Sequence, residues 1–218
     1  MELLAINGSP RGSQGATNVL LESFISGAAK AGARVKTVYL NKLNIIPCQG
    51  CFYCLDANNK SCKLDDDFKL ICNDIQKADY LVLATPIYFS NVTGIMKNFI
   101  DRLISLQGSG FVYRNNTSKI RYKLFLLAVC GLEDSNVFLP LVNMYKNSNS
   151  NFCGYLTRTM SEVLLRSDIK EKLNWYFHAV QQAGYELINN GVISDGVQEI
   201  LEKDICPRNI YKWVLSNF

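Results

Sequence analysis

The hydrophobic pattern of this chain of 218 residues changes repeatedly between that of buried strands and that of amphipathic helices. Short apolar runs bounded by polar or glycine-rich stretches are typical of strands that are buried on both faces. Such runs predict strands at residues 3–6, 80–84 and 122–130, and alternation of apolar and polar residues predicts another at 35–40. Residues 152–165 are rich in β-branched and aromatic side chains, and we expect a fifth strand there.

Apolar residues spaced three and four apart predict helices between these strands. The predicted helices cover residues 17–31, 65–77, 93–106 and 170–190, and two short helices close the chain. Residues 141–151, rich in Asn and Ser, are expected to form a mobile excursion. Strands that alternate with helices predict an α/β fold in which both faces of a parallel sheet are covered. We therefore expect one flavodoxin-like, doubly wound domain over residues 1–218, with a five-stranded parallel sheet in the order 2-1-3-4-5.

Composition and charge exclude several classes of partner. Hydrophobic residues make up 48% of the chain and charged residues 19%, as in an ordinary globular protein with a core. The net charge is +4, but Lys and Arg are scattered, so we expect no nucleic-acid partner. No stretch approaches the roughly 18 apolar residues that span a membrane. Residues 1–7 lack the basic start of a signal peptide, and we expect a cytoplasmic protein without a membrane partner.

The first candidate site is the polar stretch at residues 7–18, between the first predicted strand and the first predicted helix. In a doubly wound sheet this loop opens at the carboxyl edge, where ligands bind. Its glycines let backbone amides turn inward, and the start of the helix adds its dipole. Ser9, Ser13 and Thr17 supply hydroxyls, and Arg11 supplies a guanidinium. The stretch predicts a phosphate-binding loop that is neither a P-loop nor a dinucleotide motif; a polar connector capped by Thr17 is the alternative.

The second candidate site is residues 85–92, TPIYFSNV, after the third predicted strand. Pro86 fixes a turn there, and Tyr88 and Phe89 can lie against a flat ring. An aromatic pair in this position can equally belong to the core. Next to a phosphate-binding loop, however, it predicts a ligand with a phosphate at one end and an aromatic ring at the other. Flavin mononucleotide (FMN) has this shape.

The third candidate site is a cysteine-rich loop at residues 48–62. Four of the eight cysteines lie there, in the spacing Cys48-x2-Cys51-x2-Cys54-x7-Cys62. Close thiolate spacing lets one loop wrap an iron–sulfur cluster, and Cys-x2-Cys-x2-Cys also occurs in bacterial ferredoxins. Structural zinc usually divides its cysteines into two separated pairs, which the middle cysteine here disturbs. A cluster, free or disulfide-bonded thiols, and zinc remain the three alternatives.

Three motifs together resemble the NAD(P)H-dependent FMN reductase group of flavodoxin-like proteins: Gly8-Ser9-Pro10-Arg11, Pro86-Ile87-Tyr88-Phe89, and Gly94-x2-Lys97-x-Phe99-x-Asp101-Arg102. The resemblance covers roughly the first 130 residues. It implies that the FMN phosphate is held by Ser9, Arg11, Ser13, Thr17 and Asn18. It also implies that the ring and ribityl chain are held by Pro86, Ile87, Tyr88, Phe89 and Asn91, with the loop that starts at Gly131.

The cysteine segment is similar to that of the iron–sulfur flavoproteins. This resemblance implies a [4Fe–4S] cluster held by Cys48, Cys51, Cys54 and Cys62, although other relatives keep such cysteines with no cluster assigned. It also implies a homodimer or higher homo-oligomer with the flavin near the interface.

The predicted function is an FMN-dependent oxidoreductase without an obvious catalytic acid or base. Electrons from NAD(P)H, or from a ferredoxin through the cluster, would pass through the flavin to a small-molecule acceptor. The alternatives are a cluster-free NAD(P)H reductase of quinones, azo or nitro compounds, and an electron carrier without a substrate. Three further expectations concern single groups: Asp65–Asp67 cap a helix, Asp101 and Arg102 form an ion pair, and His178, the single histidine, is a surface or packing residue.

Overall fold

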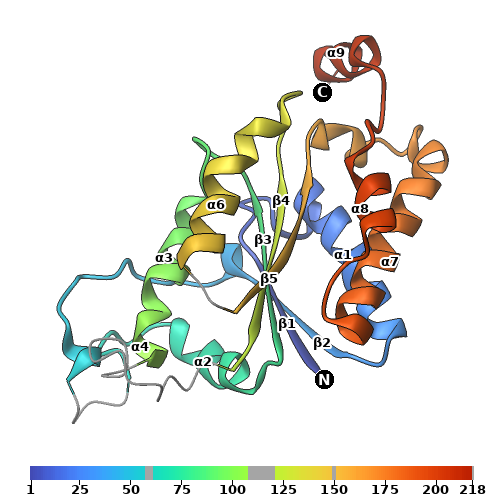
Figure 1. Ribbon diagram of the computed structural model, residues 1–218. Helices are drawn as coiled ribbons and strands as arrows, with labels where there is room; N and C mark the ends of the chain where they lie inside the picture. Colours follow the sequence, from blue (N-terminus) through green and yellow to red (C-terminus); the bar gives the residue numbers. More distant parts are fainter. Residues whose placement is uncertain (57–60, 108–120, 149–150, 218) are drawn as a thin grey trace.

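Five parallel strands form the centre of the molecule in the order β2-β1-β3-β4-β5 (Figure 1). The computed structural model describes residues 1–56, 61–107, 121–148 and 151–217. The strands are β1 (Glu2–Asn7), β2 (Arg34–Tyr39), β3 (Tyr80–Pro86), β4 (Lys123–Val129) and β5 (Phe152–Arg158). The predicted fold class and strand order are confirmed.

Helices cover both faces of this sheet (Figure 1). One face carries α1 (Ala16–Lys30), α7 (Asn174–Asn190) and α8 (Asp195–Glu202). The other face carries α2 (Phe68–Lys77), α3 (Gly94–Arg102) and α6 (Leu139–Ser148). The short helix α4 (Ile104–Gln107) follows α3, and α9 (Arg208–Ser216) lies beyond the carboxyl end of the sheet. None of the helices in these segments has the length and apolar character needed to cross a membrane.

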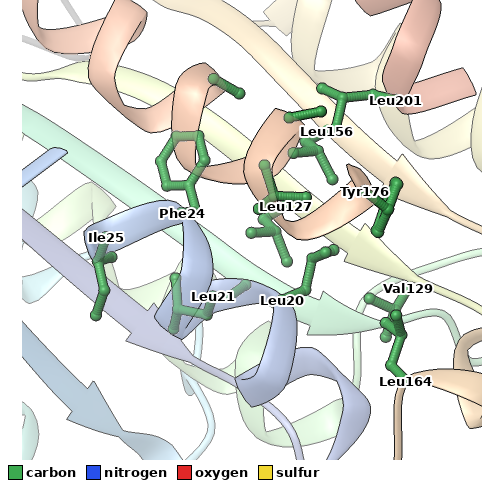
Figure 2. Packing of buried hydrophobic residues seen from close by; sticks show 14 of the residues in the cluster. Leu20, Leu21, Phe24, Ile25, Leu127, Val129, Leu156, Leu164, Tyr176 and Leu201 are labelled. Carbon is green, nitrogen blue, oxygen red and sulfur yellow. The ribbon is translucent and has the colours of Figure 1, made fainter. Parts of the chain in front are cut away.

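Alternate residues of the central strands face two separate cores. Leu3 and Ala5 of β1 pack toward α1 and α7, whereas Leu4 and Ile6 pack toward the opposite helices. Figure 2 shows the first of these cores, where Phe24 of α1 packs over the sheet near Leu127. Burial on both faces explains why the central strands appear in the sequence as continuous apolar runs.

Three predicted elements differ from the structure. Residues 141–148 of the predicted mobile excursion belong to helix α6, because Leu141, Val142 and Tyr145 are buried against the sheet, and residues 149–150 lie outside the described residues. The predicted helix 93–106 divides into α3 and α4 around Leu103. The predicted fifth strand ends at Arg158, because Met160 adopts a left-handed conformation (φ 52°) and the 3-10 helix η5 (Ser161–Leu165) follows.

Candidate functional site

The loop between β1 and α1 turns tightly at the carboxyl edge of the sheet. Two of its amides donate to nearby groups of the protein: Gly8 N–H donates to Ala84 O (2.8 Å), and Ser9 N–H donates to Asn7 Oδ1 (2.9 Å). The 3-10 helix η1 (Gly12–Gln14) follows, with Gly12 in the left-handed region (φ 54°) that glycine tolerates best. A Cβ on Gly15 would lie 2.7 Å from Ser9 Oγ, so the loop closes tightly on the start of α1.

Helix α1 begins at this loop without a side-chain cap. Its N-cap residue is Gly15, and its first turn carries no acidic residue. The first amides of a helix need an acceptor, and they favour negative charge. By contrast, α3 is capped by Thr93, whose hydroxyl accepts from Met96 N–H (3.3 Å). The start of α1 is therefore suited to an anion held beside Ser9 and Thr17.

Asn18, which is predicted to contact the phosphate, makes several hydrogen bonds within the protein. Its Oδ1 accepts from Asn7 Nδ2 (3.2 Å) and from the Tyr39 hydroxyl (3.0 Å), and its Nδ2 donates to Ser13 O (3.2 Å). Most of the hydrogen-bonding capacity of the side chain is thus used within the protein. Asn18 holds the shape of the loop.

The loop after β3 contains a strained turn that the sequence pattern did not reveal. Tyr88 and Asn91 exchange backbone hydrogen bonds (2.9 and 3.1 Å), and the two residues between them, Phe89 and Ser90, both have positive φ. Such a turn normally takes Gly or Asn, and bulky residues there cost free energy. Phe89 is fully exposed and Tyr88 is 52% exposed, so the strain presents two aromatic rings to solvent. Strain of this kind is typical of ligand sites.

Thr93, which sequence reasoning missed, joins the two loops. Its hydroxyl donates to Gly8 O (2.6 Å), and its amide donates to Thr85 Oγ1 (3.3 Å). The third loop, after β4, lies beside the second because Ile87 N–H donates to Val129 O (2.8 Å). The predicted phosphate and ring residues therefore come together at one edge of the sheet.

A cavity of about 650 Å³ lies between the loop after β4 and the end of β5. Its lining includes Glu133 and Asp134 from that loop and Arg158 and Thr159 from the end of β5. The space is large enough for a small organic molecule.

The cysteine segment does not lie beside these loops. Its start is held to the second half of α3, where Asn98 Nδ2 donates to Ile45 O (3.4 Å) and Arg102 Nη1 to Ile46 O (3.2 Å). The short helix η3 (Tyr53–Leu55), which contains Cys54, packs against α4. In Figure 1 the segment is the cyan trace beside α4, toward the amino edge of the sheet. The cysteine segment therefore lies away from the carboxyl edge of the sheet, where the two candidate ligand loops lie.

The four cysteines are free, and Cys48 and Cys51 are exposed. Burial raises the pKa of the Cys54 thiol, and its electrostatic interaction with Cys62, Cys48 and Cys51 raises it further. The other three thiols thus lie close enough to Cys54 to influence it. Within the described residues, however, no three His, Cys, Asp or Glu side chains are arranged to hold a metal ion. The donor chemistry suits a cluster, but the arrangement in this structure does not.

Two acidic groups pair differently from the sequence-based expectation. Arg102 pairs with Asp66, and both side chains are almost wholly buried (0% and 1% exposed). Asp101 pairs with Lys97 on the surface instead (2.5 Å), so the predicted Asp101–Arg102 ion pair was wrong. The carboxylate of Asp66 also accepts from Phe68 N–H (3.1 Å) at the start of α2. The N-cap residue of α2, Asp67, makes no side-chain capping bond and accepts from Asn44 N–H instead, so the prediction that Asp65–Asp67 cap this helix was only partly right.

The remaining candidates are structural. Burial raises the pKa of Cys72 and of Cys153 to about 11, which leaves both thiols protonated and unreactive. Cys130 and Cys206 are buried, as expected for core residues. His178 is exposed on α7, which agrees with the predicted role of a surface residue.

The strand order, and ligand loops at the carboxyl edge, define the flavodoxin-like class of α/β proteins. Solved structures agree. The NAD(P)H:quinone oxidoreductase of Methanothermobacter marburgensis superimposes with a TM-score of 0.62 at 15% identity, covering 86% of this chain and 96% of that one. An FMN-dependent NADH-azoreductase of Bacillus anthracis, solved in complex with FMN, gives 0.60 at 12% identity, covering 87% and 100%. Identities this low show the fold alone.

The sequence itself defines the family. The NADPH-dependent FMN reductase family matches residues 1–137, more than half of the chain, and the chain belongs to this family. Among curated proteins, an iron–sulfur flavoprotein of Archaeoglobus fulgidus is 39% identical over 115 residues, which are 53% of this chain and 55% of the relative. The match thus spans about half the length of that relative.

Proposed function

We propose that this chain is an FMN-dependent oxidoreductase. The observation that carries the proposal is that the uncapped start of α1 and the exposed aromatic turn at Tyr88–Asn91 lie at one edge of the sheet, joined by Thr93. One site suits an anion, and the other suits a flat ring. Membership in the FMN reductase family supports the same ligand.

In this proposal the phosphate is held by hydroxyls, backbone amides and one cation: Ser9, Ser13, Thr17 and Arg11, in a loop that Asn18 keeps in shape. The ring and the ribityl chain contact the two neighbouring loops, through Pro86, Ile87, Tyr88, Phe89, Asn91 and Gly131. FMN supplies the redox chemistry when it is bound. The protein orients it, and no side chain has to donate or accept a proton.

NAD(P)H is the proposed donor and a small organic molecule the proposed acceptor. The cavity beside the Gly131 loop offers space for such a molecule. A ferredoxin as donor, and a role as an electron carrier without a substrate, are the alternatives. Steady-state oxidation of NAD(P)H by the purified protein with an added quinone separates the enzyme from the carrier.

We also propose a homodimer or higher homo-oligomer, as the resemblance implies. Phe89, Tyr88 and Leu132 expose apolar side chains at the proposed flavin edge. Exposed apolar groups that lie together often mark interfaces. The compartment remains a sequence-based prediction.

The FMN proposal predicts that FMN binds at least tenfold more tightly than riboflavin, which lacks the phosphate. Each charge-assisted hydrogen bond to the phosphate contributes about 1.5–3 kcal/mol. Fluorescence titration of the apoprotein with both flavins measures the ratio. Equal affinities would contradict the phosphate site.

A matched pair of glycine variants locates that site. Gly15→Ala places a Cβ 2.7 Å from Ser9 Oγ, and should weaken FMN binding while leaving riboflavin binding unchanged. In Gly94→Ala, at the start of α3, the new Cβ meets no described atom within 4 Å, and both affinities should stay unchanged. If Gly15→Ala lowered the affinity for FMN and for riboflavin by the same factor, the phosphate would not bind at this loop.

We further propose that the cysteine loop binds a [4Fe–4S] cluster, and that the metal itself draws the four thiols together. Metal sites are rarely preformed, because clustered thiolates repel each other until the metal neutralises them. The effect of Cys48, Cys51 and Cys62 on the pKa of Cys54 is consistent with such repulsion. A cluster-free reductase is the alternative.

Anaerobic reconstitution with iron and sulfide tests this proposal. The cluster stoichiometry predicts about four irons and four labile sulfides per chain. Cys54→Ser should lose both, whereas Cys153→Ser, on the partly buried edge strand β5, should retain them. Protein that stays free of iron and still binds FMN would favour the cluster-free reductase.

A further inference from the structure

We propose that Tyr211 of the C-terminal helix α9 is a positioning residue of the flavin ring site, because it fixes the orientation of the Gly131 loop. This inference rests on the proposed FMN function. It assigns a role at the ring site to a segment outside residues 1–137, where the family match ends.

The Tyr211 hydroxyl lies between two acceptors. Its single proton is shared between the backbone carbonyl of Gly131 and Glu162 Oε2 (2.7 Å), and both oxygens accept from it. The residue is only 1% exposed. Burial, followed by the hydrogen bond to Glu162 and its charge, raises the pKa of Tyr211. The hydroxyl therefore keeps its proton and remains a donor to the loop.

The peptide that joins Gly131 to Leu132 is held on both sides. Tyr211 holds its carbonyl, and its N–H, which belongs to Leu132, donates to Cys130 Sγ (3.1 Å). The next carbonyl, Leu132 O, accepts from Met160 N–H (3.1 Å). Rotation of this peptide would break two hydrogen bonds at once. Within the described residues the Gly131 N–H has no partner, so it is the group left for a polar atom of the ring.

Glu162 restrains the same loop by contact. A Cβ on Gly131 would lie 2.8 and 2.9 Å from the two carboxylate oxygens of Glu162. The φ angle of Gly131 does not require glycine, so its small size is explained by this close approach. Tyr211 and Glu162 together leave the loop little freedom.

Helix α9 is itself held firmly enough to act on the loop. Val214 is fully buried beside Tyr211, and α9 packs against η5, which contains Glu162. The guanidinium of Arg166 lies over the Trp213 ring, 4.9 Å from its centroid. The position of α9 is thus set by the body of the protein, and Tyr211 transmits that position to Gly131.

Flavin binding by Tyr211→Phe tests the inference. The loss of one hydroxyl should raise the Kd for FMN and for riboflavin by the same factor, about three- to tenfold, because the two flavins share the ring. It should also shift the midpoint potential of the bound flavin, which a purely structural tyrosine would not do. Tyr176→Phe is the matched control, since Tyr176 is fully buried and its hydroxyl has no hydrogen-bond partner among the residues that the structure describes. This control should match the wild type in both measurements.

A second variant covers the case in which Tyr211→Phe does not fold. Gly131→Ala should displace the loop from Glu162 and weaken both flavins equally, and Gly131→Ala with Glu162→Ala should recover part of the loss. If both Tyr211→Phe and Gly131→Ala bound the two flavins with wild-type affinity and kept the wild-type midpoint potential, the role of Tyr211 would be overturned. The FMN proposal would still stand, because FMN would still be bound. A wild-type protein that binds neither flavin would overturn the FMN proposal and this inference together.

Discussion

Replacing Gly184 by alanine is expected to destabilise the protein by about 3 kcal/mol or more, the upper end of the range for overpacked cores. Helices α1 and α7 cross at two glycines, Gly27 of α1 and Gly184 of α7. Each glycine faces the backbone of the other helix. A Cβ on Gly184 would lie 1.9 Å from Phe24 O, and one on Gly27 would lie 1.8 Å from Gln181 O. A carbonyl inside a helix cannot rotate away as a side chain can. The helices would have to separate, and the core shown in Figure 2 would open.

Urea unfolding of the apoprotein measures this effect. Gly196→Ala on α8 is the matched control, because its Cβ would meet nothing within 4 Å. Alanine is the better helix former there, so this variant should gain up to about 1 kcal/mol. If Gly184→Ala unfolded at the wild-type urea concentration, the close crossing of α1 and α7 would be wrong.

The same crossing positions the proposed phosphate site. Helix α1 starts at Gly15, so a shift of its axis moves the uncapped amides that face the loop. We therefore expect any folded Gly184→Ala protein to bind FMN less tightly than Gly196→Ala. The fold and the site are coupled through helix α1.

The strand order and the site loops could be predicted because both follow from local patterns and one general rule. Apolar runs mark strands that are buried on both faces, and ligands bind where parallel strands end. To predict that residues 7–18 and residues 85–92 share one edge of the sheet, it was enough to see that each stretch follows a strand. The structure brings them together where the rule expects, and Thr93 joins them.

The course of the cysteine loop could not be predicted in this way. The spacing of the cysteines indicates which side chains could bind a metal. It does not indicate which helix holds the two ends of the loop. That depends on Asn98 and Arg102, about fifty residues further along the chain. Helix α6 was missed for a related reason: its Asn- and Ser-rich sequence resembles a loop, and only the sheet beneath Leu141 and Tyr145 makes it a helix.

Arg102→Met is expected to destabilise the protein by about 3–5 kcal/mol, because it leaves the Asp66 carboxylate buried without a counter-charge. The guanidinium also lies over the Phe68 ring, 4.6 Å from its centroid, and donates to Ile46 O (3.2 Å). Asp66 in turn accepts from Ile46 N–H (2.8 Å). The pair therefore closes the base of the cysteine loop, joining Ile46 before it to Asp66 after it. Lys97→Met removes the exposed ion pair on the same helix and should cost less than about 0.5 kcal/mol.

The pH dependence of this loss identifies its cause. Burial alone would raise the pKa of Asp66, but hydrogen bonds from Arg102, Ile46 and Phe68 outweigh it, and the folded pKa is lowered. The ion pair therefore stabilises the fold above the unfolded pKa of about 3.9, and its contribution falls as the pH drops through the folded value. Without Arg102 the buried carboxylate gains from protonation, so the stability gap between wild type and Arg102→Met should narrow below pH 4. Urea unfolding at pH 7 and pH 3 measures the gap. A gap of the same size at both values would show that lost packing, and not the buried charge of Asp66, accounts for the destabilisation.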